Sequence, residues 1–93
     1  MSTTDRELLE MAAKAINCDI KHMPSDWNPI INDGDSLRLA VGLSIGVFRD
    51  GLGVYCNHSG ARQVRIYATE ISDPCAATRR AIVRAAAEIG KVK

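Results

Sequence analysis

The residues of this chain best suited to hold a metal ion are its three cysteines and two histidines. Cys18 and His22 lie four positions apart, and Cys56 and His58 lie two positions apart. Thiolate and imidazole groups are the usual ligands of zinc, but neither spacing matches the compact ligand pairs of a zinc site. Cys56 also falls on the apolar face of an expected strand. We therefore expect buried thiols instead of a metal centre, and we expect no cofactor.

Groups for catalysis are similarly sparse. Nucleophilic catalysis needs a nucleophile, a base and an orienting group that lie together. Cys56 and His58 cannot face each other on a regular strand, and Cys75 lies in the first turn of the expected last helix. The chain has no glycine-rich phosphate loop, nucleophile elbow or paired-carboxylate motif. The sequence therefore predicts a protein that is not an enzyme.

The composition is that of an ordinary globular domain. Of the 93 residues, 46% are hydrophobic and 25% are charged, and the formal net charge is +1. Proteins that bind nucleic acid through bulk phosphate contacts usually carry a larger basic excess. The cysteines do not form a secreted disulfide pattern, and no apolar run is long enough to span a bilayer. We expect one cytoplasmic domain over residues 1–93, without membrane contact and with short flexible termini at about 1–4 and 91–93.

Capping signals and apolar spacing predict the first two helices. Thr4 and Glu7 have the spacing of a capping box, which begins a helix that fades at Asn17. A second helix is expected to begin near Asp33, because residues 33–36 offer several capping oxygens and place negative charge at the positive end of the helix dipole. The expected buried stripe of this second helix consists of Leu37, Leu39, Val41 and Leu43.

The last helix is the element that the sequence defines best. Asp73 is a good N-cap, Pro74 suits the first helical position, and Gly90 is expected to end the helix. Its expected buried stripe is Thr78, Ile82, Ala85, Ala86 and Ile89. Its basic residues are Arg79, Arg80, Arg84 and Lys91. These basic residues predict either phosphate contacts or a solvated face, and we favour the solvated face because acidic residues elsewhere cancel the field.

Period-two stretches predict a short strand at residues 18–23, a hairpin at 44–50 and 52–57, and a further strand at 62–69. Asp50-Gly51 predicts the turn of the hairpin, which would place Val47 opposite Val54. Both faces of the hairpin carry apolar groups, so we expect both to be covered: Ile45, Val47, Leu52, Val54 and Cys56 on one face, and Gly46, Phe48, Gly53 and Tyr55 on the other.

The element order α-β-α-β-β-β-α predicts an α+β fold. We expect a largely antiparallel sheet of three or four strands covered by helices, which is an α/β/α sandwich. No internal repeat or low-complexity linker divides the chain.

The segment between the first two helices contains the residues Trp27, Asn28 and Pro29. Proline excludes the residue before it from the α region, so the segment is expected to be extended or turned. The structural interpretation is that Trp27 anchors the chain to the core. The functional alternative is that Trp27, with the residues up to Asp33, Gly34 and Asp35, binds a partner. We favour the structural interpretation, since capping already explains Asp33 and Asp35.

Most of the chain resembles a family of small bacteriophage and prophage proteins, the phage α/β/α-sandwich domain family. The similar residues are 4–9, 27–30 and 33–41, followed by 73–74 and 77–87. The run from Trp-Asn-Pro to Asp-Gly-Asp is the most specific part. The resemblance implies a sheet covered by helices in a phage or prophage protein, which would reside in the cytoplasm of a bacterial host. It implies no activity, because the family has none to carry over.

Three functions remain in competition after these observations. The leading hypothesis is a non-catalytic phage accessory or interaction protein with an unknown host or phage partner. The alternative is a module that binds duplex RNA or DNA, because residues 33–90 have the α-β-β-β-α order of double-stranded-RNA-binding domains. In that case Arg79 and Arg80 would stand in for the lysine cluster of those domains. The third is a homodimer formed through an exposed sheet edge.

Overall fold

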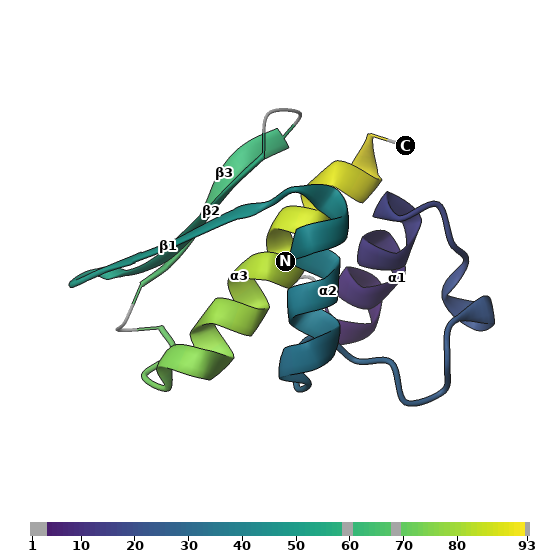
Figure 1. The fold of residues 1–93 in the computed structure, drawn as a ribbon, viewed down its shortest axis with the longest axis horizontal. Coiled ribbons are helices and arrows are strands. Elements are labelled where there is room, and N and C mark those ends of the chain that lie inside the picture. The colour runs from purple at the N-terminus through teal and green to yellow at the C-terminus, as the bar shows by residue number, and fades with distance from the viewer. Residues whose placement is uncertain (1–3, 59–60, 68–69, 93) are drawn as a thin grey trace.

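A computed structural model describes residues 4–58, 61–67 and 70–92 of the chain (Figure 1). Of the ends predicted to be flexible, at about 1–4 and 91–93, residues 1–3 and 93 lie outside the described residues, whereas Thr4 caps the first helix and Lys91 belongs to the last one. The elements are α1 (Asp5–Ala15), the short 3-10 helix η1 (Ile20–His22), α2 (Asp33–Leu43), β1 (Gly46–Asp50), β2 (Gly53–His58), β3 (Ala61–Tyr67) and α3 (Pro74–Lys91). The strands form one antiparallel sheet in the order β1-β2-β3.

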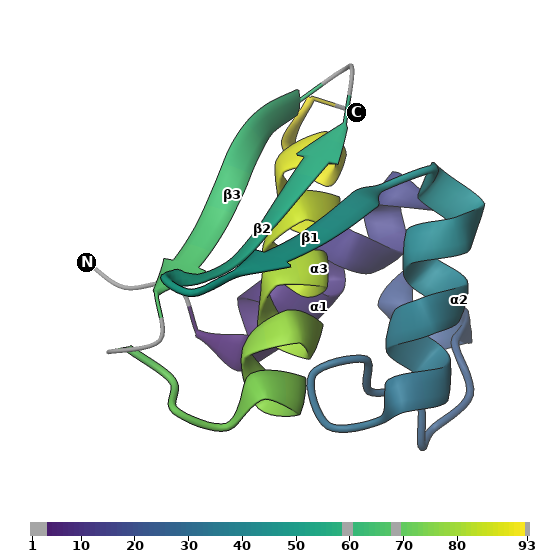
Figure 2. The same cartoon turned by 60° about the vertical axis from the view of Figure 1, so that its left-hand side comes forward.

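The helix α3 lies at the centre of the fold. It packs against β2 and β3 on one side and against α1 and α2 on the other. Figures 1 and 2 show that all three helices lie on the same side of the sheet. The α+β fold and the antiparallel sheet are confirmed. The expectation of a sandwich with both sheet faces covered is wrong in this respect, because no described helix lies over the outer face.

The helix starts follow from local capping. The Thr4 hydroxyl accepts a hydrogen bond from the Glu7 N–H at 3.2 Å, and the Glu7 carboxylate accepts one from the Thr4 N–H at 3.3 Å. The Asp73 carboxylate accepts from the Cys75 N–H at 3.2 Å, directly before Pro74. At α2 the cap is Asn32, so the prediction that residues 33–36 supply the capping oxygen is wrong, although the helix begins at Asp33 as predicted. All three predicted starts are confirmed, because each rests on contacts between neighbouring residues.

The predicted strand at residues 18–23 is wrong. Its central part is the 3-10 helix η1, in which the His22 N–H donates to the Asp19 carbonyl at 2.8 Å. The Asp19 carboxylate caps this turn by accepting from the Lys21 N–H at 3.0 Å. Asn17, with φ of 60°, turns the chain out of α1. The alternation of residue types here had no neighbouring strand to pair with, so local hydrogen bonds determined the structure.

The hairpin forms where it was predicted, but with a different register. Asp50 pairs with Gly53, so the turn residues are Gly51 and Leu52 instead of Asp50 and Gly51. The Asp50 carboxylate stabilises the turn by accepting from the Leu52 and Gly53 N–H groups at 2.8 and 3.1 Å. Val47 consequently faces Cys56. The slip is two residues, and it preserves the faces that side chains share, because strand faces alternate with period two.

The buried side of α2 is narrower than predicted. Ser36, Leu39 and Ala40 are buried, whereas Leu37 is 64% exposed and Val41 is 71% exposed. The helix stands beside α3 and touches it along one stripe, so residues a quarter-turn away from that stripe reach solvent. The prediction that Leu37 and Val41 are buried is therefore wrong, and both add apolar surface outside the core.

Small residues allow α3 to be buried on several sides. The predicted residues Ile82, Ala85, Ala86 and Ile89 are buried, and so are Ala77, Ala81, Val83, Ala87 and Gly90, which the single predicted stripe did not include; Thr78 is only half-buried. At Gly90 the backbone of α3 comes against the Met11 carbonyl of α1. Although α3 has 18 residues, none of the described helices is long and apolar enough to cross a membrane.

We expect Gly90→Ala to destabilise the protein. An added Cβ would collide with the Met11 carbonyl oxygen, which is backbone and cannot move by a side-chain rotation. Overpacking of this kind should cost about 2 kcal/mol or more of unfolding free energy, measured by urea denaturation. Gly42→Ala in α2 is the matched control, since nothing lies within 4 Å of the added Cβ. It should stabilise the protein by about 0.5–1 kcal/mol through helix propensity, and equal effects of the two substitutions would contradict the close approach of α1 and α3.

Candidate functional site

The segment that leads into α2 uses its polar groups internally. The Asn28 N–H donates to the Asp35 carboxylate at 2.9 Å, and the Asn28 side-chain oxygen accepts from the Ile30 N–H at 3.1 Å. The Asn32 side-chain oxygen accepts from the Asp35 N–H at 2.8 Å. Pro29 is fully buried. These contacts favour the structural interpretation of the Trp-Asn-Pro motif.

Trp27 also takes part in packing. It is half-buried and lies against the hydrophobic core. Its ring lines a small hollow with Met23, Pro24 and residues of α2. A tryptophan that anchors a partner is expected to expose most of its ring to solvent. The half-buried position of Trp27 therefore favours a role in packing.

Arg79 joins this segment to the central helix. Its Nε donates to the Ile30 carbonyl at 2.8 Å, and its guanidinium forms an ion pair with the Asp33 carboxylate at 2.7 Å. Only 19% of the Arg79 side chain is exposed. The structure thus brings together two sets of residues that the sequence singled out separately. Arg79 lies 49 positions from Ile30 and 46 positions from Asp33, so these contacts left no local signal in the sequence.

The other basic residues of α3 do not form one open face. Arg80 forms an ion pair with Asp5 of α1 at 2.8 Å, and its side chain is 22% exposed. Lys91 pairs with Glu88 at 3.1 Å. Arg84 is half-buried and forms no ion pair with the described residues. Arg79 and Arg80 therefore tie helices together and do not form the open, solvated face that we favoured from the sequence; their contact with phosphate stays a prediction.

The uncovered face of the sheet carries three of the four aromatic residues of the chain. Phe48 and Tyr55 stack across neighbouring strands, with ring centroids 5.1 Å apart. The Arg65 guanidinium lies over the Tyr55 ring at 4.8 Å and reaches the Tyr67 ring at 5.7 Å. Phe48 is 47% exposed and Tyr67 is 49% exposed. Strand alternation in the sequence had placed Phe48 and Tyr55 on one face of the hairpin, which is confirmed, but we had expected this face to be covered. The pairing of β3 with β2 adds Arg65 and Tyr67 to it.

An ion pair between Arg65 and Asp50 lies on this outer face. Arg65 contacts the Asp50 carboxylate at 3.3 Å. This hydrogen bond from Arg65 holds the pKa of the Asp50 carboxyl below its ordinary value, and Asp50 in turn raises the pKa of Arg65. The same Asp50 carboxylate holds the hairpin turn, so the position of Arg65 over the rings is coupled to the turn.

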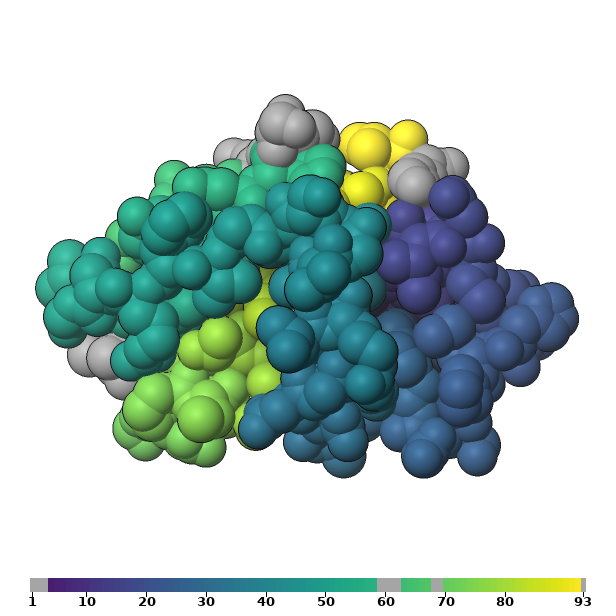
Figure 3. All heavy atoms as spheres, viewed as in Figure 1, coloured from purple at the N-terminus to yellow at the C-terminus, as the bar shows by residue number. Residues whose placement is uncertain are grey.

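A groove opens between α2, α3 and β1. Figure 3 shows the surface recessed between α2 and the hairpin, with α3 visible between them. Its volume is about 450 Å³. The lining residues are Asp33, Ser36, Leu37, Arg49, Pro74, Cys75, Thr78, Arg79 and Ile82. Exposure of Leu37, which pattern reasoning placed in the core, is what leaves this groove with an apolar wall.

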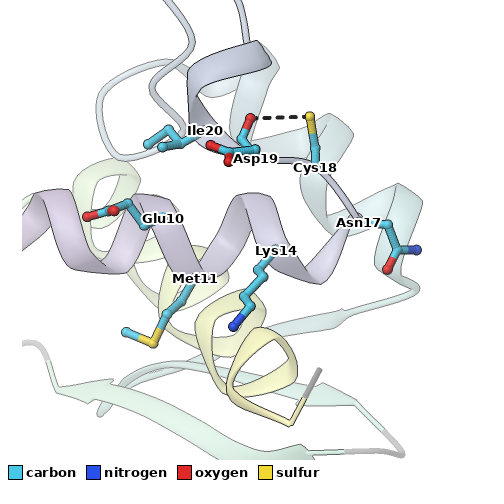
Figure 4. Close-up of a pocket in the computed structure, with 7 residues that line it drawn as sticks. All are labelled: Glu10, Met11, Lys14, Asn17, Cys18, Asp19 and Ile20. Atoms are coloured by element: carbon cyan, nitrogen blue, oxygen red, sulfur yellow. Dashed lines mark hydrogen bonds between the residues drawn. The ribbon is translucent and has the colours of Figure 1, made fainter.

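A second hollow of about 650 Å³ lies beside α1, at the turn that contains Cys18 (Figure 4). The Met11 and Lys14 side chains extend on the opposite side of α1 from Cys18 and Asp19. The polar groups of this hollow therefore do not converge on one point. Within residues 4–58, 61–67 and 70–92, no three His, Cys, Asp or Glu side chains are placed to hold a metal ion.

The three cysteines are all free thiols in different surroundings. Cys18 is half-buried, Cys75 is exposed, and Cys56 is buried in the core beneath the sheet. Burial raises the pKa of the Cys56 thiol to about 11. The expectation of buried thiols therefore holds for Cys56 alone.

Comparison with known protein families, with curated proteins and with solved structures finds no match for this chain. The resemblance to phage proteins accordingly rests on the residues given above, and it stays a prediction.

We expect Arg79→Met to destabilise the protein by about 1–3 kcal/mol. The substitution removes the charge-assisted hydrogen bond to the partly buried Ile30 carbonyl and the ion pair with Asp33. Arg84→Met is the matched control on the same helix, and it should change the unfolding free energy by less than about 0.5 kcal/mol. Urea denaturation of the two variants measures both values. A loss from Arg79→Met no larger than that from Arg84→Met would show that Arg79 is not a structural tie.

We expect the stability of the protein to fall as the pH rises from 9 to 11. The unfolded Cys56 thiol ionises near its ordinary pKa of 9.0, whereas burial holds the folded thiol protonated up to about 11. The unfolded state therefore loses this proton first, which favours unfolding in that range. Cys56→Val should flatten the decline in midpoint temperature between pH 9 and pH 11. An unchanged pH profile in Cys56→Val would contradict the assignment to Cys56.

Proposed function

We propose that this chain is a non-catalytic interaction protein that binds another protein through the outer face of its sheet. The observation that carries the proposal is the placement of Phe48, Tyr55 and Tyr67 on the face that the helices leave open. The core itself is aliphatic and built largely from alanine, valine and isoleucine. The residues best able to provide binding energy therefore lie outside the core.

Burial of these aromatic side chains against a partner would contribute to the free energy of binding. An aromatic side chain buries roughly 150–250 Å², so covering the exposed half of one ring removes about 100 Å² from water. At about 25 cal/mol per Å², this contributes on the order of 2.5 kcal/mol for each of Phe48 and Tyr67 before the costs of association. Aromatic residues and arginine are also the residues enriched in the energetic centres of protein interfaces.

The geometry of the rings favours a protein partner over a nucleic acid. Sequence-tolerant binding of single strands requires ring faces on which bases can stack. Tyr55 has Phe48 over one side and the Arg65 guanidinium over its ring, so its faces are already occupied. The charge of Arg65 is balanced by Asp50. The central ring is thus closed to stacking, and the paired charges leave the face with little net charge, which suits an apolar protein segment better than a phosphate backbone.

The basic helix gives little support to duplex binding. Arg79 and Arg80 form ion pairs with Asp33 and Asp5, and phosphate contact would have to break these pairs.

Dimerisation through the sheet edge is also not favoured. The sheet has two edge strands, β1 with 5 residues and β3 with 7. β1 ends in Arg49 and Asp50, and β3 contains Arg62 and Arg65, and short, charged edges resist pairing with another strand. The resemblance to phage proteins supports a partner encoded by the phage or its bacterial host.

The test is a selection of binders from a displayed library of phage and bacterial protein fragments, followed by measurement of Kd with purified protein. The face variant is Phe48→Ser with Tyr67→Ser. The control is Val41→Ser with Leu52→Ser, which removes two exposed apolar side chains from outside this face. We expect the face variant to raise Kd at least tenfold and the control to change it less than twofold, with both variants folded by circular dichroism.

Three results would overturn the proposal. The first is the recovery of no binder, or only of binders that both variants weaken equally. The second is salt-dependent binding of oligonucleotides that the face variant loses, which would assign the face to nucleic acid. Sedimentation of the wild-type protein should show a monomer in the micromolar range, and a dimer lost in the face variant would equally contradict a heterologous partner.

A further inference from the structure

The groove between α2, α3 and β1 is separate from the outer face of the sheet. Its wall on α2 is formed by Ser36 and Leu37, and Ile82 and Thr78 of α3 lie across from them. The surface that these and the other lining residues expose to the groove is mostly carbon. Its volume of about 450 Å³ falls within the range of roughly 300–1,000 Å³ that is usual for small-molecule sites. The groove is therefore large enough for a small ligand with an apolar body.

A buried hydroxyl in the groove lining has no partner. Ser36 is 2% exposed, and its Oγ is the buried side-chain polar atom without a hydrogen bond among the described residues. Burial of a polar group without a hydrogen bond is costly, and native proteins rarely leave such a group unpaired. The hydroxyl oxygen is itself closed off from solvent, so a hydrogen-bond acceptor in the groove would satisfy it once the Ser36 side chain turns about χ1.

The groove also has one unbalanced positive charge. Arg79 and Asp33 both line it, but they neutralise each other. Arg49 of β1 lies at the groove as well, is exposed, and forms no ion pair with a described residue. The N-terminus of α3 adds no anion site, because Asp73 already caps it. The fixed charge available to a ligand is therefore the guanidinium of Arg49.

We propose that this groove binds a small carboxylate with an apolar body, such as a short fatty acid. The apolar lining would contact the hydrocarbon part of the ligand. Its carboxylate would form an ion pair with the Arg49 guanidinium and accept a hydrogen bond from the Ser36 hydroxyl. A neutral alcohol of the same length offers no such charge. Guanidinium groups bind carboxylates through charge-assisted hydrogen bonds, which are stronger than neutral ones.

The test is a titration of isotope-labelled protein with octanoate, followed by amide chemical shifts, with 1-octanol as the matched neutral ligand. We expect saturable shifts at Ser36, Leu37 and Ile82 with octanoate, and at least tenfold weaker binding of 1-octanol. Arg49→Gln should weaken octanoate at least fivefold while it leaves 1-octanol unchanged. Arg6→Gln on α1, which removes the same charge away from the groove, should change neither ligand.

Two further measurements keep the proposal open to contradiction. Ser36→Ala should raise the midpoint temperature of the free protein, because it removes an unpaired buried hydroxyl, and it should weaken octanoate. Bound octanoate should also slow alkylation of Cys75, an exposed thiol of the groove lining. Absence of saturable shifts at 10 mM octanoate, or equal loss of binding in Arg49→Gln and Arg6→Gln, would overturn the proposal. Neither result would bear on the proposed protein-binding face.

Discussion

The close approach of α3 to α1 is the constraint on which the rest of the structure depends. At Gly90 the two backbones are near enough that a Cβ has no room, and buried alanines line both helices along this contact. Because the opposite side of α3 carries the sheet, its position sets both layers of the core. The ion pairs of Arg80 with Asp5 and of Arg79 with Asp33 then tie the N-terminal part of α3 to the two other helices.

This packing also explains why aromatic residues lie outside. Backbones held close together by alanine and glycine leave little volume between layers, and a ring would force them apart. Phe48, Tyr55 and Tyr67 are accordingly placed on the open side of the sheet, where Arg65 and Asp50 order them. A small aliphatic core and an aromatic surface are thus two consequences of one arrangement.

The two surfaces that we assign to binding arise from different physical causes. The outer face exists because all helices lie on one side of the sheet. The groove exists because α2 touches α3 along a narrow stripe, which leaves Leu37 exposed and Ser36 without a partner for its hydroxyl. They share only β1, whose successive residues Phe48 and Arg49 point to opposite sides of the sheet. Their chemistry differs, one aromatic with balanced charge and the other aliphatic with an unbalanced arginine, so each can be altered without the other.

The sequence by itself determined the features that depend on neighbouring residues. The capping box at Thr4, the start of α2 and the Asp73-Pro74 start of α3 involve contacts over a few positions, and strand alternation sorted the hairpin side chains by face even with the register wrong by two residues. Tertiary structure decided which faces are covered, where Leu37 and Val41 lie, and which carboxylates hold the arginines. The physical reason is that burial and ion pairing between residues far apart depend on how layers stack. Periodicity within one element carries no information about that stacking.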